Sequence, residues 1–588
     1  MQHVIAREGR QVDGKVASDL DNIIRDANLT PAQSIFWQQQ VKASELKNKS
    51  SMRWHPAIIR LALTIFEASR SAYERLHQSG FLQLPTSRTL FDYTHFAKIT
   101  EGIDDVALDS ITKRVHKLPK DRKYHVLMTD EMYISKNLVY NKHTGELVGY
   151  THLDHVDQEL KALDLFFNDP KAELKKEVAT KIMAYLVKGV ANDVKEVVAI
   201  YGVHNFTPKQ MCAWTWEIIS ALERNGIRVI AFTCDGSPIN RAFIKMHEPS
   251  HTPRPSGVVY STVNIAAPTR DLFFIADVPH LLKTLRNSFF RSRLGGRGKR
   301  LMTRNGQRIV WDHIIRLYNA KKGKVIRKSY KLTAQHVYPD SYFCMKVGPA
   351  AQVLSTTVAK DLQSQKWPGT SETVNFILKC DHWFDDTNGP QTSTGIKKRK
   401  ERLCPYKKTD DWRFQEMEDF VKYLHDWQEE AQNSQADVSG IAALPSFCAN
   451  EDMNTTFNDL VEDNDDMDDE TPAAKKLPAA PTILGIEMAT YALIGAIKFL
   501  IREGLAFVNP RVFCQDPLEQ YFSKQRDGCG GSTNPNLKQA LNKQRTIHVV
   551  GQAGLKKKRG NTEVDPNECP ALLSAEPLQK KKKESLNL

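Results

Sequence analysis

Two kinds of apolar pattern divide the chain. Short runs rich in β-branched and aromatic residues predict strands at 124–134, 197–203, 228–234 and 271–276. Apolar positions at helical spacing predict helices at 208–225, 238–246, 412–432 and 486–503. The turn sequence at 141–145 predicts a hairpin between 138–140 and 147–151. Strands that come first and then alternate with helices indicate an α/β fold in which helices cover a mixed sheet.

The first 115 residues carry a different pattern. Residues 1–50 are polar and partly helical, with Pro31 suited to a first helical turn after Thr30. The stretch 52–75 predicts a helix that begins at Pro56. A turn and a second helix capped by Thr86 or Ser87 follow, which resembles a helix-turn-helix. A small helical domain that touches no DNA fits the spacing equally well.

A folded basic region lies between residues 281 and 331, where Asp312 is the only acid. Helices are predicted at 314–318 and 353–362. A solvated charged face is one interpretation. The interleaved Phe289, Phe290, Trp311 and Tyr318 favour the other, a surface that contacts phosphates. Residues 374–388 run from apolar to aromatic to acidic, and the polar stretch 386–405 reads as an exposed loop.

Composition and charge narrow the function classes. The 588 residues carry a net charge of +13, and the sequence pI is about 9.1, which favours a polyanionic partner such as nucleic acid. Nine scattered cysteines form no C-x-x-C pair, which indicates a reducing compartment and no zinc finger. The longest apolar run, 488–501, is too short to span a membrane. Ten acids between 451 and 470 predict a disordered linker, and the tail after residue 554 is basic.

Acidic residues interrupt the strand patterns at positions where a strand should be apolar. Asp130 and Glu131 lie inside the first predicted strand, Asp235 ends a later one, and Glu519 falls on a helix that begins near Pro517. Neighbouring side chains on a strand face opposite sides, so only one of Asp130 and Glu131 can face a shared site. Carboxylates from distant segments can hold two Mg²⁺ ions for a phosphodiester displacement. A purely structural role for these acids is the alternative.

Four segments, in order, resemble the motifs of the P-element transposase family. They are TDEMYISKNLVYNKHTGELVGY, IRVIAFTCDGSPINRAF, FFIADVPHLLKTLRNSF and CQDPLEQYFSKQRDGCGGSTNPN. The resemblance covers roughly residues 50–545. It implies a ribonuclease H-like catalytic domain split by a largely helical GTP-binding insertion and preceded by the helix-turn-helix-like domain. It also implies catalytic, metal-binding roles for Asp130, Asp235 and Glu519, with Glu131 and Asp516 as rivals.

The same resemblance supplies expectations for a nucleotide. FDDTN matches the family's guanine-reading segment, which implies roles for Asp385 and Asn388, and Lys283 is the expected phosphate contact. Gly295, Gly296 and Gly298 resemble a phosphate loop only loosely, and His280 is expected to be structural. The expected division is 1–50 (polar segment), 51–115 (helical domain), 120–277 (catalytic, first part), 278–400 (GTP-binding insertion), 401–448 (its helical continuation), 449–482 (acidic linker), 483–550 (catalytic, last part) and 551–588 (basic tail).

These expectations add up to a DNA transposase that cuts and joins DNA with two Mg²⁺ or Mn²⁺ ions and uses GTP for assembly rather than hydrolysis. Transposon ends and target DNA are the expected partners, with a homo-oligomer, no membrane and a nuclear location. One family feature is missing, because a THAP domain needs an N-terminal zinc site and the first cysteine is Cys212. A non-catalytic DNA- or chromatin-binding protein derived from a transposase is therefore the alternative, and a GTP-binding regulator is a third.

Overall fold

The computed structural model describes residues 29–46, 51–94, 100–141, 145–152, 177–294, 300–323, 327–389, 400–433, 474–527, 534–550 and 578. The predictions for the acidic linker at 451–470 and for the glycines at 295–298 lie outside these residues, as do almost all of those for residues 1–28 and for the basic tail.

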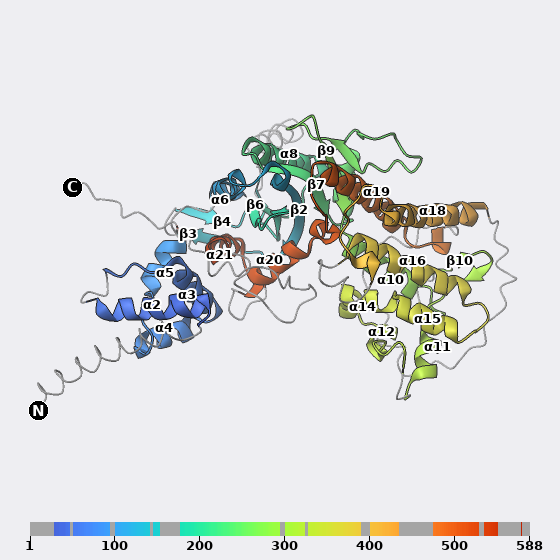
Figure 1. Ribbon diagram of the computed structural model, residues 1–588, viewed down its shortest axis with the longest axis horizontal. Coiled ribbons are helices and arrows are strands. Elements are labelled where there is room, and N and C mark those ends of the chain that lie inside the picture. Colours follow the sequence, from blue (N-terminus) through green and yellow to red (C-terminus); the bar gives the residue numbers. More distant parts are fainter. Residues whose placement is uncertain are drawn as a thin grey trace, which may run out of the picture.

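A seven-stranded mixed sheet occupies the centre of the molecule (Figure 1). Its order is β1-β6-β5-β2-β7-β9-β8, and β2, β7 and β9 run parallel while the other neighbours pair antiparallel. The strands are β1 (Gly102–Ile103), β2 (Tyr124–Tyr133), β5 (Lys181–Gly189), β6 (Lys195–Val203), β7 (Arg228–Cys234), β8 (Ser261–Val263) and β9 (Asp271–Ala276). The mixed α/β architecture and the four strands predicted for this sheet are confirmed.

Two strand features differ from what the apolar pattern alone suggests. β5 pairs with both β2 and β6, although no strand was predicted there. The predicted hairpin forms as β3 (Val139–Asn141) and β4 (Glu146–Val148), but it makes a separate two-stranded sheet. The hairpin is held near the C-terminal part of the chain, because Ser135 donates from its N–H and its hydroxyl to the carbonyls of Pro535 and Asn534.

Helices that begin at capped prolines flank the sheet. α8 (Pro208–Arg224) begins at a capping box between Thr207 and Gln210 and ends before Gly226, whose φ of 74° is easily adopted only by glycine. α9 (Pro238–Lys245) is capped by Ser237. Both helices confirm the predicted spans to within a residue or two.

The central apolar helix, α19 (Ala480–Arg502), begins six residues before the predicted start. By length and composition it could cross a membrane, but 72% of its apolar window is buried inside the protein. It packs on β9 and α10 (Val278–Phe290). Gly495 and Gly485 permit this close approach, because a Cβ there would lie 2.4 Å from Phe273 and 2.6 Å from Leu281. Each fully buried Ile or Leu of α19 contributes roughly 1.5–3 kcal/mol.

The N-terminal helical domain contains three short helices where one long helix and one short one were expected. The chain breaks at Ser69, whose hydroxyl caps the second helix. Its small core also takes Val549 and Val550 from the C-terminal helix. The helices are α3 (Pro56–Ala68), α4 (Arg70–Ser79), α5 (Ser87–Thr94) and the C-terminal α21 (Leu537–Val550), with α2 (Pro31–Glu45) before them.

The expected boundary of this domain at residue 115 needs correction. β1 pairs with β6, and α6 (Asp105–His116) packs on the same strand, so residues from about 100 onward belong to the central sheet. The apolar face of α6, formed by Ala107, Ile111 and Val115, is buried. The spacing of apolar residues in α6 shows that one side of the helix is buried, but it does not show which part of the protein that side packs against. The sequence alone therefore could not assign α6 to the central sheet.

Helices form most of the described chain between β9 and α19, together with a small hairpin of β10 (Thr303–Arg304) and β11 (Gln307–Arg308) (Figure 1). The predicted helix at 353–362 forms, but it begins at Thr356, because Ser355 caps its start. The aromatic side chains of Phe289, Phe290 and Trp311 are buried in the core, so they do not line a phosphate-contacting surface. Besides α10, the helices are α11 (Asp312–Lys321), α12 (Ala334–Val337), α13 (Ser341–Cys344), α14 (Val347–Val353), α15 (Thr356–Ser364), α16 (Ser371–Thr387) and α18 (Trp412–Asn433).

The prediction of an exposed loop at 386–405 is wrong for its described ends. α16 continues to Thr387, and Asp386 is only 1% exposed. Leu403 is also buried, and Arg402 is paired with Asp386. The charged residues of this stretch suggested a solvent-exposed loop. The sequence does not show that Asp386 and Arg402, which are 16 positions apart, pair with each other in the folded protein.

Candidate active site and nucleotide site

Asp130 lies near the C-terminal end of β2, and its environment differs sharply from that of Glu131. Burial first, and then the carboxylates of Asp235, Glu519 and Asp277, raise the pKa of Asp130 to about 8. Glu131, whose side chain faces the other way, forms an ion pair with Lys181 at 2.7 Å. Of the two rivals, Asp130 therefore faces the other acids.

Strand register brings Asp235 to the same side of the sheet as Asp130, at the C-terminal ends of the parallel strands. β2 and β7 are parallel, with Met128 opposite Thr233, and Asp130 and Asp235 each lie two residues beyond that pair. The Asp235 carboxylate accepts hydrogen bonds from the Asn240 side chain at 2.6 Å and from the Ser237 N–H at 2.9 Å. The start of α9 therefore holds this carboxylate in one orientation.

A third aspartate, Asp277, continues the row. β7 and β9 pair Cys234 with Ala276, so Asp235 and Asp277 directly follow paired residues. Asp277 is buried, caps α10 by accepting from the His280 N–H, and has a pKa raised to about 7, first by burial. The sequence analysis placed Asp277 in the third family-like segment, FFIADVPHLLKTLRNSF, but assigned it no role. Its position in the Asp-Val-Pro-His motif was the signal that could have identified it.

Glu519 joins the row from α20 (Asp516–Asp527). The segment before this helix is fixed to the strand ends, because the Gln515 side chain donates to the Thr129 carbonyl at 2.5 Å and Thr233 donates to the Phe513 carbonyl at 2.9 Å. Burial raises the pKa of Glu519. Asp516, the expected rival, forms an ion pair with Arg511 at 2.7 Å.

The donor chemistry of this cluster fits Mg²⁺ or Mn²⁺, which prefer carboxylate oxygens. Among the described residues, no three His, Cys, Asp or Glu side chains stand close enough for a finished metal site. Burial and mutual repulsion raise the pKa values of Asp130 and Asp277, and a cation would relieve that repulsion. The cluster thus has the composition of a metal site, with carboxylates that would have to draw together around an ion.

Lys283 lies close enough to these acids for its charge to act on two of them. Its positive charge lowers the pKa of both Glu519 and Asp277, against the larger effect of burial. The charges that act most strongly on Asp385 are instead those of Asp381, Lys400 and Arg402. The expected role of Lys283 as a phosphate contact stays a prediction.

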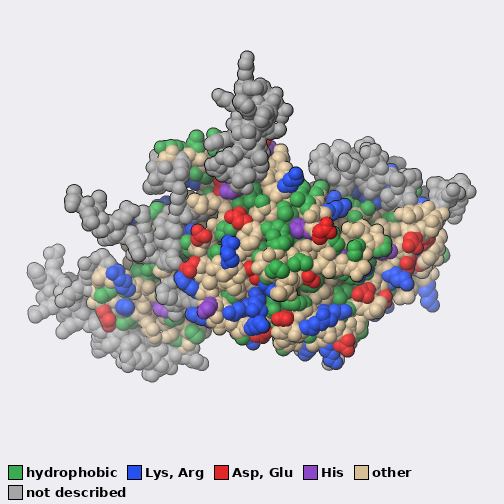
Figure 2. All heavy atoms as spheres, turned by 90° about the horizontal axis from the view of Figure 1, so that it is seen from above, with side chains coloured by type: hydrophobic (Ala, Val, Ile, Leu, Met, Phe, Trp, Pro, Cys, Tyr) green, Lys and Arg blue, Asp and Glu red, His purple; other side chains and the backbone are tan. Residues whose placement is uncertain are grey.

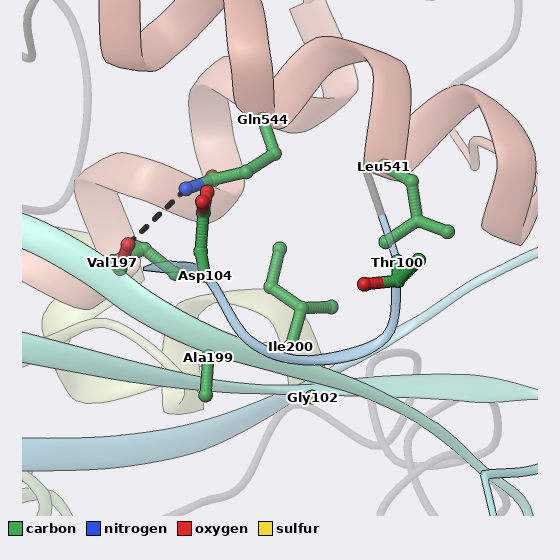
Figure 3. Close-up of a pocket in the computed structure, with 8 residues that line it drawn as sticks. All are labelled: Thr100, Gly102, Asp104, Val197, Ala199, Ile200, Leu541 and Gln544. Carbon is green, nitrogen blue, oxygen red and sulfur yellow. Dashed lines mark hydrogen bonds between the residues drawn. The ribbon is translucent and has the colours of Figure 1, made fainter. Parts of the chain in front are cut away.

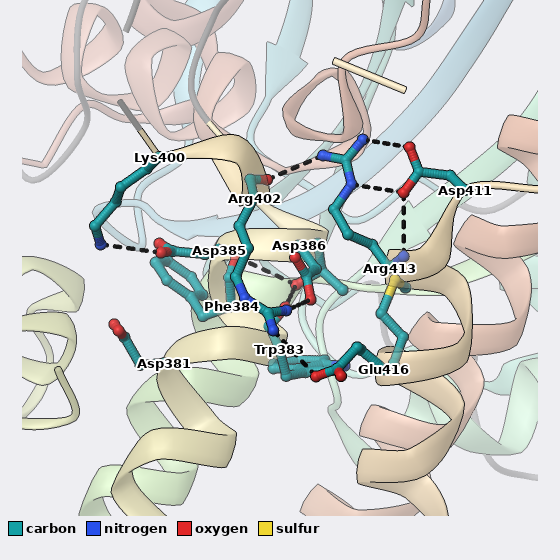
Figure 4. A network of polar contacts seen from close by, with 12 residues as sticks. Asp381, Trp383, Phe384, Asp385, Asp386, Lys400, Arg402, Asp411, Arg413 and Glu416 are labelled. Carbon is teal, nitrogen blue, oxygen red and sulfur yellow. Dashed lines mark hydrogen bonds and ion pairs between the residues drawn. The ribbon is translucent and has the colours of Figure 1, made fainter. Parts of the chain in front are cut away.

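The residues of that expected guanine site gather at the C-terminal end of α16 (Figure 4). Lys400 pairs with Asp385 at 3.2 Å, and burial raises the pKa of Asp385. The Asn388 N–H donates to the Phe384 carbonyl, and its side-chain oxygen is buried without a hydrogen-bond partner among the described residues. A buried acceptor without a donor is costly, so this atom fits a ligand contact.

Asp386 supports this network and was missed by the sequence prediction. It accepts from Arg402 at 2.6 Å, and Arg402 also binds Glu416 at 3.0 Å (Figure 4). Arg413 donates to the Arg402 carbonyl at 3.0 Å and thereby fixes the returning chain. The ion pair between Asp386 and Arg402 thus holds the end of α16, which carries Asp385, against the returning segment that carries Lys400.

A small cavity lies elsewhere, between β6, the residues before α6 and α21 (Figure 3). Its walls are mostly apolar, and Gln544 donates to the Val197 carbonyl across it at 3.3 Å. Asp104 on its rim already caps α6 and pairs with Arg545 at 3.4 Å. This cavity contains none of the acids described above.

Comparisons with known proteins match the two parts of the molecule separately. The family model described as the TNP-like, RNase H N-terminal domain matches residues 99–248, and the TNP-like, GTP-binding insertion domain matches residues 279–399. The first match begins where β1 and α6 join the sheet. The fold is thus a ribonuclease H-like domain with a GTP-binding insertion domain.

A relative and a solved structure agree with these matches. The Transposable element P transposase of Drosophila melanogaster is 23% identical over 339 residues, which are 56% of this chain and 38% of that protein. The structure described as the Drosophila P element transposase strand transfer complex has a TM-score of 0.62 at 19% identity, covering 88% of this chain and 96% of that chain. The likeness of the structures shows a shared fold.

Proposed function

We propose that this chain, which carries two consecutive domains of the P-element-type transposase family, is a DNA transposase. Asp130, Asp235 and Glu519 would hold two divalent ions at the edge of the sheet. The observation that carries the proposal is the convergence of these acids from three distant segments at the ends of adjacent parallel strands and one helix.

The chain's own residues prepare this site for phosphodiester chemistry. When bound, Mg²⁺ or Mn²⁺ would activate a water or 3′-hydroxyl and stabilise the leaving oxygen. Asn240 and Ser237 orient Asp235, and Gln515 fixes the helix that carries Glu519. Lys283 offsets part of the negative charge of the acids and would contact a phosphate.

The insertion domain would bind GTP as an assembly cofactor, without a hydrolytic cycle. The Asp385 carboxylate can accept from both the ring N–H and the exocyclic amine of guanine, a donor pattern that adenine lacks. The unpartnered oxygen of Asn388 supplies a second contact. Lys400, now paired with Asp385, would have to give way to the base.

DNA is the proposed partner, and the protein would act as a homo-oligomer in the nucleus. The charge favours this partner, because the whole chain carries +13, and Lys and Arg side chains lie among acidic ones on the face seen in Figure 2. The N-terminal helical domain, with its three short helices, would contact DNA.

The test is to incubate the protein with the ends of its own element, Mg²⁺ and GTP, and to follow cut and joined DNA products. Products that need the metal and disappear in Asp235→Ala support the proposal. DNA binding without any metal-dependent product would instead favour a non-catalytic DNA-binding protein.

A further inference from the structure

Exposed aromatic side chains cluster on and beside two short helices of the insertion domain, α12 and α13. Tyr342 is 61% exposed, Met345 61% and Tyr338 42%, and Tyr330, just before α12, is 66% exposed. None of them belongs to the network around Asp385 or to the carboxylate row, which consists of Asp130, Asp235, Asp277 and Glu519. Tyrosine rings normally bury most of their area. Several exposed rings within a short stretch of the chain therefore indicate a surface that binds a partner.

The surroundings of these rings are basic. Lys346 lies with its ammonium 4.0 Å from the centre of the Tyr342 ring. Lys328 and Lys331 are exposed beside Tyr330. Between 327 and 346 the described residues include Arg327 and these three lysines but only one acid, Asp340. Asp340 is already committed, because it caps α13 by accepting from the Phe343 N–H.

Buried hydrogen bonds fix this surface to the core of the insertion domain. The Arg286 side chain, which is 0% exposed, donates to the Cys344 carbonyl at 2.6 Å and so holds the end of α13 against α10. Trp311 donates to the Val337 carbonyl at 2.9 Å and holds the end of α12. The exposed rings therefore stand on a rigid support, which lowers the entropy cost of binding.

The same helix links this support to the carboxylate row. α10 begins immediately after Asp277, and at about 1.5 Å per residue Arg286 lies about 14 Å along the helix. Lys283 lies one turn before Arg286, close enough to Glu519 for its positive charge to lower the pKa of that carboxyl group, against the larger effect of burial. The basic aromatic surface is thus positioned by the element that also borders the acids.

We propose that Tyr338 and Tyr342, together with Lys346, bind single-stranded DNA on the insertion domain, with the rings stacking on unpaired bases. This inference rests on the proposed transposase function. Stacking platforms flanked by cations are typical of surfaces that bind single strands, whereas a duplex keeps its base faces covered. The positive charge also disfavours a second copy of this basic chain as the occupant.

The test measures binding of the full chain to a fluorescent oligo-dT strand by anisotropy, at fixed salt and with EDTA. Replacing both rings (Tyr338→Ala with Tyr342→Ala) should weaken oligo-dT binding at least roughly tenfold, since stacking contributes strongly for each base. The matched Tyr→Phe pair keeps the ring faces and should bind like the wild type. Binding of a duplex of equal length should change little.

A second variant checks the charge independently of the rings. Lys346→Gln should reduce the slope of log affinity against log salt by about 0.7 for the single strand. Thermal unfolding of each variant establishes that the fold is retained. This binding assay contains EDTA and no metal, so its result does not depend on DNA cutting. A failure of metal-dependent cutting in the separate assay would contradict the proposed function and leave this binding result unaffected.

Two results would overturn the inference. One is wild-type binding of oligo-dT by the double Ala variant. The other is an Ala variant with unchanged DNA binding but altered sedimentation, which would make this surface an interface between copies of the chain.

Discussion

The backbone N–H of Gln515 donates to the carboxylate of Asp277 at 2.9 Å, and the two residues lie 238 positions apart in the sequence. The Gln515 side chain reaches the Thr129 carbonyl in β2. One residue therefore ties the start of α20 to two strands of the sheet after the whole insertion has intervened. Glu519, on the first turn of α20, owes its place beside the aspartates to these bonds.

Replacing Gln515 by Ala should lower both stability and DNA cutting. The variant loses a buried hydrogen bond and leaves the Thr129 carbonyl without its donor, which costs about 1–3 kcal/mol of unfolding free energy. Thermal unfolding and metal-dependent cutting measure the two effects. Gln539→Ala is the control, because Gln539 is exposed and, among the described residues, its side chain accepts a hydrogen bond only from the nearby Asn536 N–H. Equal behaviour of the two variants would contradict this role for Gln515.

Asp130→Asn and Glu131→Gln should separate the two neighbouring acids. Asp130 faces the other carboxylates, so its substitution should abolish metal-dependent cutting. Glu131 makes an ion pair with Lys181, and such a partly exposed pair contributes only about 0–1 kcal/mol to stability. Glu131→Gln should therefore cut DNA nearly as well as the wild type. The opposite ranking in a cutting assay would show that the register argument is wrong.

His548 should make stability depend on pH. Its imidazole lies 2.6 Å from Glu196, and this carboxylate and Asp104 raise the pKa of His548 despite burial and Arg545. A histidine whose pKa is raised by folding contributes fully below about pH 6.5, its ordinary value, and loses that contribution as pH rises through the folded value.

The difference in thermal midpoint between wild type and His548→Gln measures this contribution alone. It should be largest near pH 6 and shrink as the pH increases. A difference that stays constant across this range would mean that the pair with Glu196 does not titrate as described.

Asp385→Asn should change the base preference of the insertion domain. The carboxylate matches the two donors of guanine, whereas an amide matches the donor and acceptor of xanthine. Thermal shift should show stabilisation of the wild type by GTP and not by ATP, and stabilisation of the variant by XTP. Lys400→Met, which removes only the partner of Asp385, should still respond to GTP. A wild type that does not respond to GTP would exclude the nucleotide site.

Local patterns predicted the fold where one segment carries the whole signal. Capped helices such as α8 and the strand that ends just before Asp235 follow from periodicity, turn residues and Pro or Gly positions. The choice of Asp130 over Glu131 needed the strand pairing, because the sequence shows only that the two face opposite ways.

Other features depend on partners that the sequence does not identify. The burial of Asp386 follows from Arg402, and the place of α6 follows from β6. The basic region also shows this limit, because its aromatic residues are of two kinds. Phe289 and Trp311 are in the core, while Tyr330 is on the surface.

The most direct measurement of the central claim is metal-dependent cutting of the element's ends by wild type, Asp235→Ala and Asp235→Cys. If Asp235 is a metal ligand, the Ala variant should cut in neither metal. The Cys variant should fail with Mg²⁺, which requires oxygen ligands, and recover part of its activity with Mn²⁺, the softer ion. Cutting by Asp235→Ala at the wild-type rate would contradict the account.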